Sequence, residues 1–414
     1  MKSLSSFVRE VNFMRHNRAV IMTLSCAFIL SGLAVIGGLY ELQRQQETIA
    51  NIKAADYEDR TAVLAEQDTW GGAAYYSFHL TYNPPDDFAF AAMGQRDTHP
   101  WKHRIRMLAI EGQIYERDTN NPIIALIGRF DFSFFAAFVL PFLIIILLHD
   151  IRASEKRAGR FYLLLASAEK TTNLWLIRTL VLSLSLYMCV LIPLIIGGII
   201  NHVSISVIMT AAFYLFLYVT FWTLISYWFA SWNKSTSFIL ASLIGFWIMV
   251  AVLIPTGTRM VIDGAVPVPS GAEILMKQRE TVNGAWDIPK EETMQVFLER
   301  YPEWSAYAAI DRPFEWKWYF AFQEVGDLKT ENLSQAFREG RLKRDRLAGY
   351  GSLIAPPVLF ERALQSLAKT DTRSNLAFEE KVREFHAQLR QFYYPQLFKN
   401  EPFDGDLLEE LPSF

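Results

Sequence analysis

The chain alternates between long apolar runs and long charged stretches. Five mainly apolar runs lie in the first 255 residues, within 19–40, 131–149, 179–200, 207–230 and 237–255, and residues 256–414 contain none. A helix rises about 1.5 Å per residue and the hydrocarbon core of a bilayer is about 30 Å thick, so about 20 apolar residues span it. The pattern predicts an all-α polytopic membrane protein with five transmembrane helices, of which the second and fifth are the shortest.

The basic residues of the connecting segments indicate how these helices are oriented, because short segments rich in Lys and Arg resist translocation. Residues 1–18 hold four basic residues against one acid, and residues 150–178 hold six against three acids. Residues 201–206 hold no Lys or Arg. We therefore expect a multi-pass protein of the bacterial cytoplasmic (inner) membrane with its N-terminus in the cytoplasm.

This orientation divides the whole chain into segments. We expect a cytoplasmic interfacial helix at 1–18, transmembrane helices at 19–40, 131–149, 179–200, 207–230 and 237–255, a cytoplasmic loop at 150–178, a cytoplasmic turn at 231–236, and extracytoplasmic segments at 41–130 and 256–414. A basic flank without a helix is the alternative for residues 1–18. The first apolar run is longer than that of a cleaved signal peptide and lacks a small-x-small site, which favours a signal anchor.

The two extracytoplasmic segments are expected to form one mainly α-helical domain. Both cysteines, Cys26 and Cys189, lie inside apolar runs, so no disulfide can support this domain and it needs an apolar core of its own. Residues 41–67 contain neither Pro nor Gly, which predicts that the first transmembrane helix continues outward. Apolar residues spaced three and four apart predict a further helix packed on one face; they are Phe378, Val382, Phe385, Leu389 and Phe392.

The stretch EKRAGRFYLLLASAEK, residues 155–170, lies between the second and third apolar runs. Its apolar centre is too short to cross a membrane and is flanked by charges. An apolar patch at the membrane surface is typical of a docking element for another protein. The alternative is that its leucines pack against the end of the helix bundle while its basic residues meet lipid phosphates.

The longer stretch HDIRASEKRAGRFYLLLASAEKTTNLWLIR resembles the corresponding loop in membrane subunits of type-2 ABC transporters. In that family an acidic residue, a glycine four positions on and a leucine run form a coupling element that docks in a groove of the ATPase; Glu155, Gly159 and residues 163–165 match it. PPDDFAFAAMGQRDTHP (84–100), NPIIALIGRFDFSFFAAFVLP (121–141) and ALQSLAKTD (363–371), with Phe378 and Val382, are similar to a subgroup with a long extracytoplasmic domain. That subgroup is often grouped with permeases for the maturation of copper enzymes.

The resemblance implies which residues contact the ATPase. They are Arg152, Glu155, Lys156, Gly159, Arg160, Leu163, Leu164 and Lys170, with Asn233 and Lys234 of the 231–236 turn. Two features depart from the family pattern. Ala166 to Ala168 replace the proline that commonly follows the leucines, and the family has six transmembrane helices, so the chain is either a five-helix form or ends before a final helix.

The resemblance implies a permease subunit that is not itself an enzyme. The sequence has no phosphate-binding G-x-x-x-x-G-K-[ST] loop, so ATP and Mg would be bound by a separate ATPase and this chain needs no cofactor. The expected partners are two ATPase copies, a second or related permease, membrane lipid and a periplasmic protein or lipoprotein, without nucleic acid. ATP hydrolysis would drive export of an unidentified substrate; alternatively, it would reshape the external domain to act on an envelope partner without transport.

The sequence offers little catalytic chemistry. The H-E-x-x-H and G-x-S-x-G motifs are absent. His99 and His103 would share one face only if the segment were helical, and no carboxylate completes a ligand set nearby, so a metal site is not predicted. Hydroxyl groups in the apolar runs, such as Ser183, Tyr187 and Tyr218, are expected to serve helix packing more than a substrate path.

Overall fold

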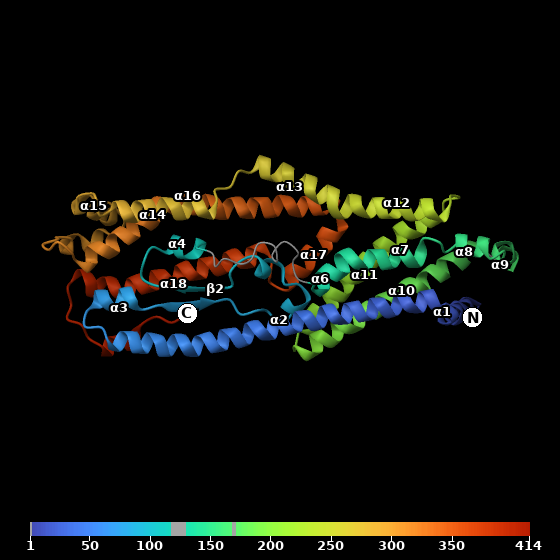
Figure 1. The fold of residues 1–414 in the computed structure, drawn as a ribbon, viewed down its shortest axis with the longest axis horizontal. Helices are drawn as coiled ribbons and strands as arrows, with labels where there is room; N and C mark the ends of the chain where they lie inside the picture. Colours follow the sequence, from blue (N-terminus) through green and yellow to red (C-terminus); the bar gives the residue numbers. More distant parts are fainter. Residues whose placement is uncertain (1, 117–129, 168–170) are drawn as a thin grey trace.

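The computed structural model shows an elongated, mainly helical molecule, in which residues 2–116, 130–167 and 171–414 are described (Figure 1). One end, which carries the N-terminus, is a bundle of long apolar helices, and the other is a set of charged helices around a second apolar core. We call these two parts the apolar bundle and the distal domain. The predicted mainly helical fold is confirmed.

The apolar bundle contains five helices that are long and apolar enough to cross a membrane, which fits a membrane protein and confirms the predicted number for the described residues. Its elements are α1 (Lys2–His16), α2 (Arg18–Ala65), α6 (Phe132–Phe134), η3 (Phe135–Val139), α7 (Leu140–Leu148), α8 (Ala153–Arg157), α9 (Phe161–Ser167), α10 (Thr171–Ile200), α11 (Ile205–Ala230), α12 (Thr236–Ile248), η4 (Met249–Leu253) and α13 (Ile254–Ala265).

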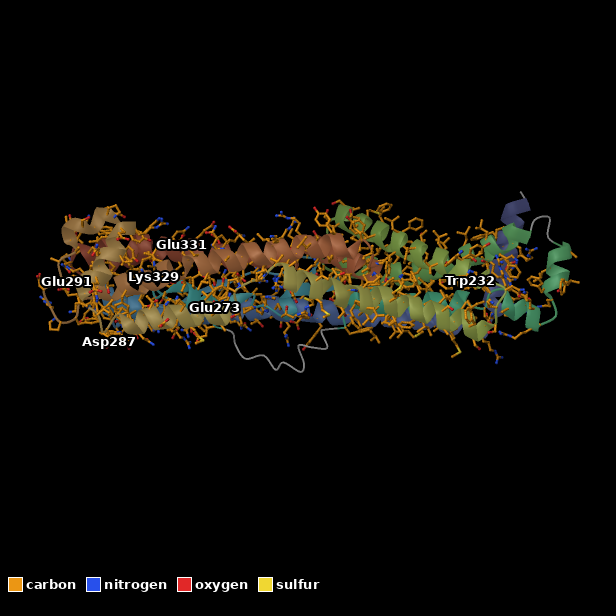
Figure 2. All side chains as sticks on the ribbon, turned by 90° about the horizontal axis from the view of Figure 1, so that it is seen from above. Trp232, Glu273, Asp287, Glu291, Lys329 and Glu331 are labelled. Atoms are coloured by element: carbon orange, nitrogen blue, oxygen red, sulfur yellow. The ribbon has the colours of Figure 1, made fainter. Side chains whose placement is uncertain are left out.

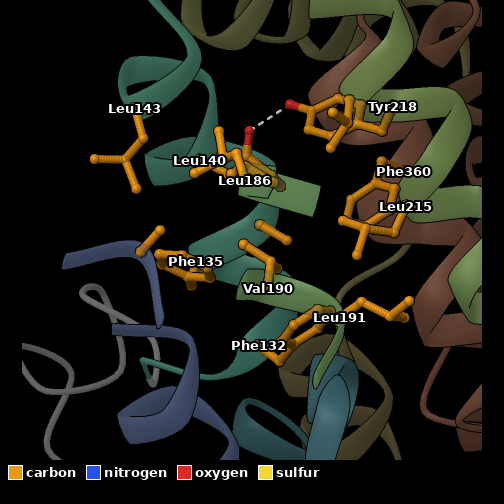
Figure 3. Close-up of a cluster of buried hydrophobic side chains, with 14 of the residues drawn as sticks. Phe132, Phe135, Leu140, Leu143, Leu186, Val190, Leu191, Leu215, Tyr218 and Phe360 are labelled. Carbon is orange, nitrogen blue, oxygen red and sulfur yellow. Dashed lines mark hydrogen bonds between the residues drawn. The ribbon is translucent and has the colours of Figure 1, made fainter. Parts of the chain in front are cut away.

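The second and fifth membrane helices are longer than their apolar runs. They extend over Phe132–Arg157 and Thr236–Ala265, and each contains one π-helical turn, η3 and η4. A π-turn leaves backbone groups without their usual helical partners. The buried hydroxyl of Tyr218 donates to the carbonyl of Ala137 in η3 at 2.5 Å, as Figure 3 shows, and so satisfies one of them.

Helix α2 runs without a break through both parts of the molecule (Figure 1). The side chain of Asn17 caps it by accepting from the backbone N–H groups of Ala19 and Val20, at 3.1 and 3.4 Å. Its 48 residues correspond to a length of roughly 70 Å, more than twice the thickness of a hydrocarbon core. The predicted outward continuation of the first apolar helix is therefore present.

The distal domain is built from two segments that are far apart in the sequence. Its elements are α3 (Trp70–Tyr76), β1 (His79–Tyr82), η1 (Ala89–Ala91), η2 (Gly94–Asp97), β2 (Lys102–Ile105), α4 (Ile110–Tyr115), α14 (Gly271–Gly284), α15 (Lys290–Arg300), η5 (Pro302–Tyr307), α16 (Trp316–Ser352), α17 (Pro356–Leu367), α18 (Thr372–Phe398) and η6 (Asp406–Glu410). Residues from both segments share one apolar core. Four residues of the predicted stripe on α18 are buried in it, and Phe392 packs against it partly buried; the four are Phe378, Val382, Phe385 and Leu389. Charged side chains such as Glu273, Asp287 and Glu291 cover its outer surface (Figure 2).

One small sheet was not predicted. Strands β1 and β2 form an antiparallel pair in which His79 lies opposite Ile105 and Thr81 lies opposite His103. His103 lies in β2, and His99 lies outside any helix. The two imidazoles therefore do not share a helical face.

Two short pieces of the distal segments pack into the core of the apolar bundle, at the joint between the two parts. One is the stretch 88–93 around η1, and the other is α17, whose Phe360 stacks on Tyr218 with ring centroids 4.6 Å apart (Figure 3). A Cβ atom on Gly38 of α2 would lie only 1.9 Å from the carbonyl oxygen of Phe90, so glycine is required for this contact. The joint is thus a closely packed node and not a loose linker.

Candidate functional site at the N-terminal end of the bundle

The predicted coupling segment lies at the tip of the apolar bundle, at the end of the molecule opposite the distal domain (Figure 1). Helices α8 and α9 form this tip together with α1, the first turns of α10 and the turn between α11 and α12. Trp232 of that turn is labelled at the same end in Figure 2. The two segments that the sequence assigned to one site are therefore neighbours.

A buried ion-pair network holds the tip together. Glu155 on α8 is 2% exposed and accepts from Arg178 Nη1 of α10 at 2.8 Å and from Arg160 Nε at 2.9 Å. Arg178 is also buried, and its Nε donates to Glu10 of α1 at 2.7 Å. Each buried charge thus has at least one partner of opposite sign, which is the condition for burying such groups. The network joins three elements that are far apart in the sequence.

Gly159 makes the turn between α8 and α9. Its φ of +69° lies in the left-handed region that favours glycine. Its N–H donates to the carbonyl of Lys156 at 3.1 Å, and the N–H of Arg160 donates to the carbonyl of Glu155 at 3.1 Å. This pair of bonds is a Schellman motif, which ends a helix and reverses the chain. The spacing of acid and glycine in the sequence therefore has a structural cause, because the glycine ends the helix that carries Glu155.

Helix α9 turns apolar side chains outward. Phe161 anchors it, since its ring stacks on Trp175 of α10 with centroids 5.9 Å apart at 21°. Tyr162 and Leu163 are 80% and 72% exposed, while Leu164 is half-buried. Packing against the bundle therefore accounts for Phe161 and part of Leu164, whereas Tyr162 and Leu163 form an apolar surface at the tip.

Two polar contacts tie α8 to the turn between α11 and α12. Lys156 Nζ donates to Asn233 Oδ1 at 3.1 Å, and Arg157 Nη1 donates to Thr236 Oγ1 at 2.8 Å. Lys234 lies in the same turn and is exposed. Helix α8 thus contacts both this turn and the first residue of α12.

Arg152 precedes α8 and faces aromatic rings. Its guanidinium lies 5.8 Å from the ring centroid of Trp175 and 5.4 Å from that of Tyr227, and Nη2 donates to Tyr227 Oη at 3.3 Å. Such stacking favours Arg over Lys. Lys170, the remaining predicted site residue, lies outside the described residues.

A small cavity of about 180 Å³ lies beside the ion pairs, between α1, α2, α7 and α10. Glu10, Glu155 and Arg178 line it together with apolar residues of the bundle. Among the described residues, no group of three or more His, Cys, Asp or Glu side chains could hold a metal ion.

Sequence reasoning missed two members of this network. Arg178 is 8% exposed, and its guanidinium contacts two carboxylates. Glu10 was counted only as an acid among basic residues. Its isolation in a basic, apolar-faced helix was a usable signal, because a lone acid there needs a cationic partner.

The histidines considered for metal binding have other contacts. The His103 ring stacks on Phe378 with centroids 5.6 Å apart, and His99 interacts with Arg341 Nη2 at 3.1 Å and with Thr98 Oγ1 at 2.9 Å. These contacts connect the segment that ends in β2 to α16 and α18. They give both imidazoles a structural role.

Comparison with known proteins gives one match. Residues 272–414 match a family described as a domain of unknown function (DUF3526). No curated protein and no solved structure matches the chain. The matched region begins in α14 and covers α15 to η6, which is most of the second segment of the distal domain, so it leaves the tip of the bundle outside the match.

Proposed function

We propose that the chain is the membrane subunit of an ATP-driven transporter of the ABC type, whose separate ATPase binds the α8–α9 tip. The observation that carries this proposal is the exposed apolar pair Tyr162 and Leu163 on α9. Phe161 anchors α9 on Trp175, and the preceding helix α8 is held by the buried ion pair of Glu155 with Arg178. Exposed apolar side chains on a rigid support are typical of docking surfaces. The resemblance of this segment to coupling elements of type-2 ABC permeases supports the same assignment.

The contacts of the tip give a route for force. Arg178 connects it to α10, Glu10 connects it to α1 and so to α2, and Lys156 connects it to the turn before α12. Closure of an ATPase dimer on ATP would push α8 and α9 and shift these helices as packed bodies. Coupling of the tip to three membrane helices supports a role in transport driven from the cytoplasmic side.

Substitution of Leu163 tests the docking role. We expect Leu163→Glu to lower ATPase binding more than tenfold, because a charge replaces an apolar contact at the centre of the surface. The measurement is co-purification with candidate ABC ATPases of the same organism, and stimulation of their ATP hydrolysis. Tyr57→Glu is the matched control, since Tyr57 is 67% exposed on the distal part of α2. Unchanged binding and stimulation by Leu163→Glu would contradict the proposal.

A second candidate function is force transmission to an envelope partner without transport. The packing of the bundle favours it, because several buried or partly buried hydroxyl groups bond other helices: Ser31 donates to Val190 O at 3.1 Å, Tyr187 to Ala212 O at 3.1 Å, and Thr223 to Ser183 Oγ at 2.9 Å. Hydroxyl groups engaged in this way do not line a polar path.

Reconstitution with the ATPase separates the two functions. Movement of a cargo across the vesicle membrane on ATP addition supports export. Force transmission predicts that no cargo moves while amide hydrogen exchange in α17 and residues 88–93 changes between the nucleotide-free and ATP-bound states. If neither cargo movement nor exchange at the joint responds to ATP, both functions are excluded.

A further inference from the structure

A second cavity lies near the joint, on the side of the bundle away from the coupling tip. It has a volume of about 660 Å³ and is open, with walls from α13, α16 and α17. Pro255, which lines it, is the last residue of the fifth apolar run. The cavity therefore starts where the fifth membrane helix leaves its apolar stretch.

Close approaches of the backbone fix the separation of its walls. A Cβ atom on Gly340 of α16 would lie 2.6 Å from Val268 Cγ2, and one on Gly351 would lie 2.4 Å from Thr258 Cγ2. Both glycines allow α16 to approach the α13 region more closely than other residues would. Between these two points the small side chain of Ala348 lines the cavity and leaves space.

The lining carries more positive than negative charge. Four arginines and two aspartates contribute to it. Arg344 bonds Val266 O at 2.9 Å and Asp263 Oδ1 at 3.0 Å, while Arg362 Nη1 donates to Asp345 Oδ1 at 2.8 Å. Arg341 pairs with Glu379 at 3.2 Å, so three of the four arginines have a close acidic partner.

Arg259 has a much weaker contact. Its side chain is 86% exposed, and its nearest carboxylate oxygen, on Asp263, is 3.6 Å away. A guanidinium in this state can donate to a further anion, and Arg is well suited to phosphate.

Exposed apolar side chains lie on the same elements as the lining, next to it in the sequence. Met260 and Val261 on α13 are 72% and 71% exposed, and Leu353 and Ile354 at the turn between α16 and α17 are 66% and 63% exposed. Exposed apolar residues beside basic ones at the end of a membrane helix are typical of contact with acyl chains and headgroups. A ligand that fits both features has a phosphate group and an apolar tail.

We propose that this cavity binds the phosphate headgroup of an anionic phospholipid, with Arg259 as the main contact and the acyl chains along Met260 and Leu353. The site depends only on the placement of the five apolar helices in a membrane and not on coupling to an ATPase. It would tie the joint between the bundle and the distal domain to the surface of the bilayer. Lipid composition would then affect how the two parts move together.

Native mass spectrometry of the full chain in detergent tests the proposal, with phosphatidylglycerol, phosphatidylcholine and glycerol 3-phosphate as separate probes. We expect phosphatidylglycerol to bind more tightly than the other two. Arg259→Gln should weaken it by up to about fivefold, the range for one exposed charge contact. Ala348→Phe should weaken it by about tenfold or more, because the added ring fills the cavity. Arg300→Gln, an exposed change on α15, is the control and should have no effect.

Each alternative outcome is decisive. Equal binding of phosphatidylglycerol and phosphatidylcholine would overturn the proposal, as would equal binding by the wild type and Arg259→Gln. Tight binding of glycerol 3-phosphate alone would assign the cavity to a soluble phosphate compound instead of a lipid. If Ala348→Phe does not fold, the comparison of Arg259→Gln with Arg300→Gln still decides, because both replace exposed side chains.

Discussion

The apolar bundle and the distal domain bury polar groups in different ways. In the bundle, the buried charges that the structure describes lie at its ends, such as Glu155 and Arg178 at the tip and Asp131 at the joint. The distal domain places charges inside its core: Asp327 accepts from Arg390 Nη2 at 2.6 Å and from the N–H of Ile110 at 2.9 Å.

This difference is the one expected for a bundle that spans a membrane and a distal domain that lies in water. A domain in water without disulfides can fix its helices with buried ion pairs, whereas helices in lipid gain more from close packing and from hydroxyl groups bonded to backbone. Substitutions in each part measure how far this contrast holds.

The largest effect is expected for Arg390→Leu in the distal domain. The change leaves Asp327 and Glu324 buried without their cation and should cost about 3 to 5 kcal/mol of stability. Burial already raises the pKa of Asp327 to about 6 against the effect of Arg390, so the variant should protonate this group. Chemical unfolding followed by circular dichroism measures the loss. Arg300→Leu is the control, and equal stability of the two variants would show that the buried ion pairs contribute little.

The next effect concerns pH and the joint. Burial, followed by repulsion from Asp131, raises the pKa of Glu361 on α17 to about 7. A buried Glu with a raised pKa stabilises the fold only in its neutral form. The contribution of Glu361 to stability is therefore fully present below the ordinary pKa of Glu, and it is lost as the pH rises through about 7. Glu361→Gln should be more stable than the wild type by about 2 to 3 kcal/mol at pH 8 and close to it at pH 4.5.

The measurement is unfolding in detergent across this pH range. Glu331→Gln, an exposed change on α16, is the control and should follow the wild type. A constant difference between Glu361→Gln and the wild type at every pH would show that Glu361 does not titrate in the joint.

Close packing in the joint gives a third comparison. Gly38→Ala on α2 should destabilise the protein by about 1 to 3 kcal/mol, because the added methyl group meets the backbone of Phe90. Gly32→Ala on the same helix meets nothing within 4 Å and should stabilise it by up to about 1 kcal/mol through helix propensity. Thermal unfolding of both variants tests this, and equal shifts would indicate that the joint is loosely packed.

The smallest effect is expected for Tyr218→Phe in the bundle. The change removes the hydrogen bond to Ala137 O but keeps the ring on Phe360, so the loss should be about 1 kcal/mol. Tyr57→Phe is an exposed control. A loss as large as that of Arg390→Leu would remove the contrast between the two parts of the molecule.

The sequence predicted what depends on local pattern. The five apolar helices, the outward continuation of α2 and the buried stripe of α18 are present, because each follows from residues close together in the chain. The turn at Gly159 could also be predicted from the sequence, because the spacing between Glu155 and Gly159 is that of one helix end.

Contacts over long sequence distances could not be predicted in this way. The Arg178–Glu10 bond joins residues 168 positions apart, and the Arg383–Glu111 bond joins residues 272 positions apart. The packing of α17 into the bundle was missed for the same reason, because its residues read as an ordinary amphipathic helix of the second distal segment. The sheet of β1 and β2 was missed because both strands are only four residues long.

Because α2 is one uninterrupted helix, a small rotation at one end displaces the other end by a larger distance. A helix of this length that pivots by about 5° at its capped end near Asn17 carries its far end through roughly 6 Å. Such a rotation would displace the end of α2 beside α3 by about one helical turn. The packed contact between Gly38 and Phe90 lies between the two ends of α2, so this contact would have to move with the helix.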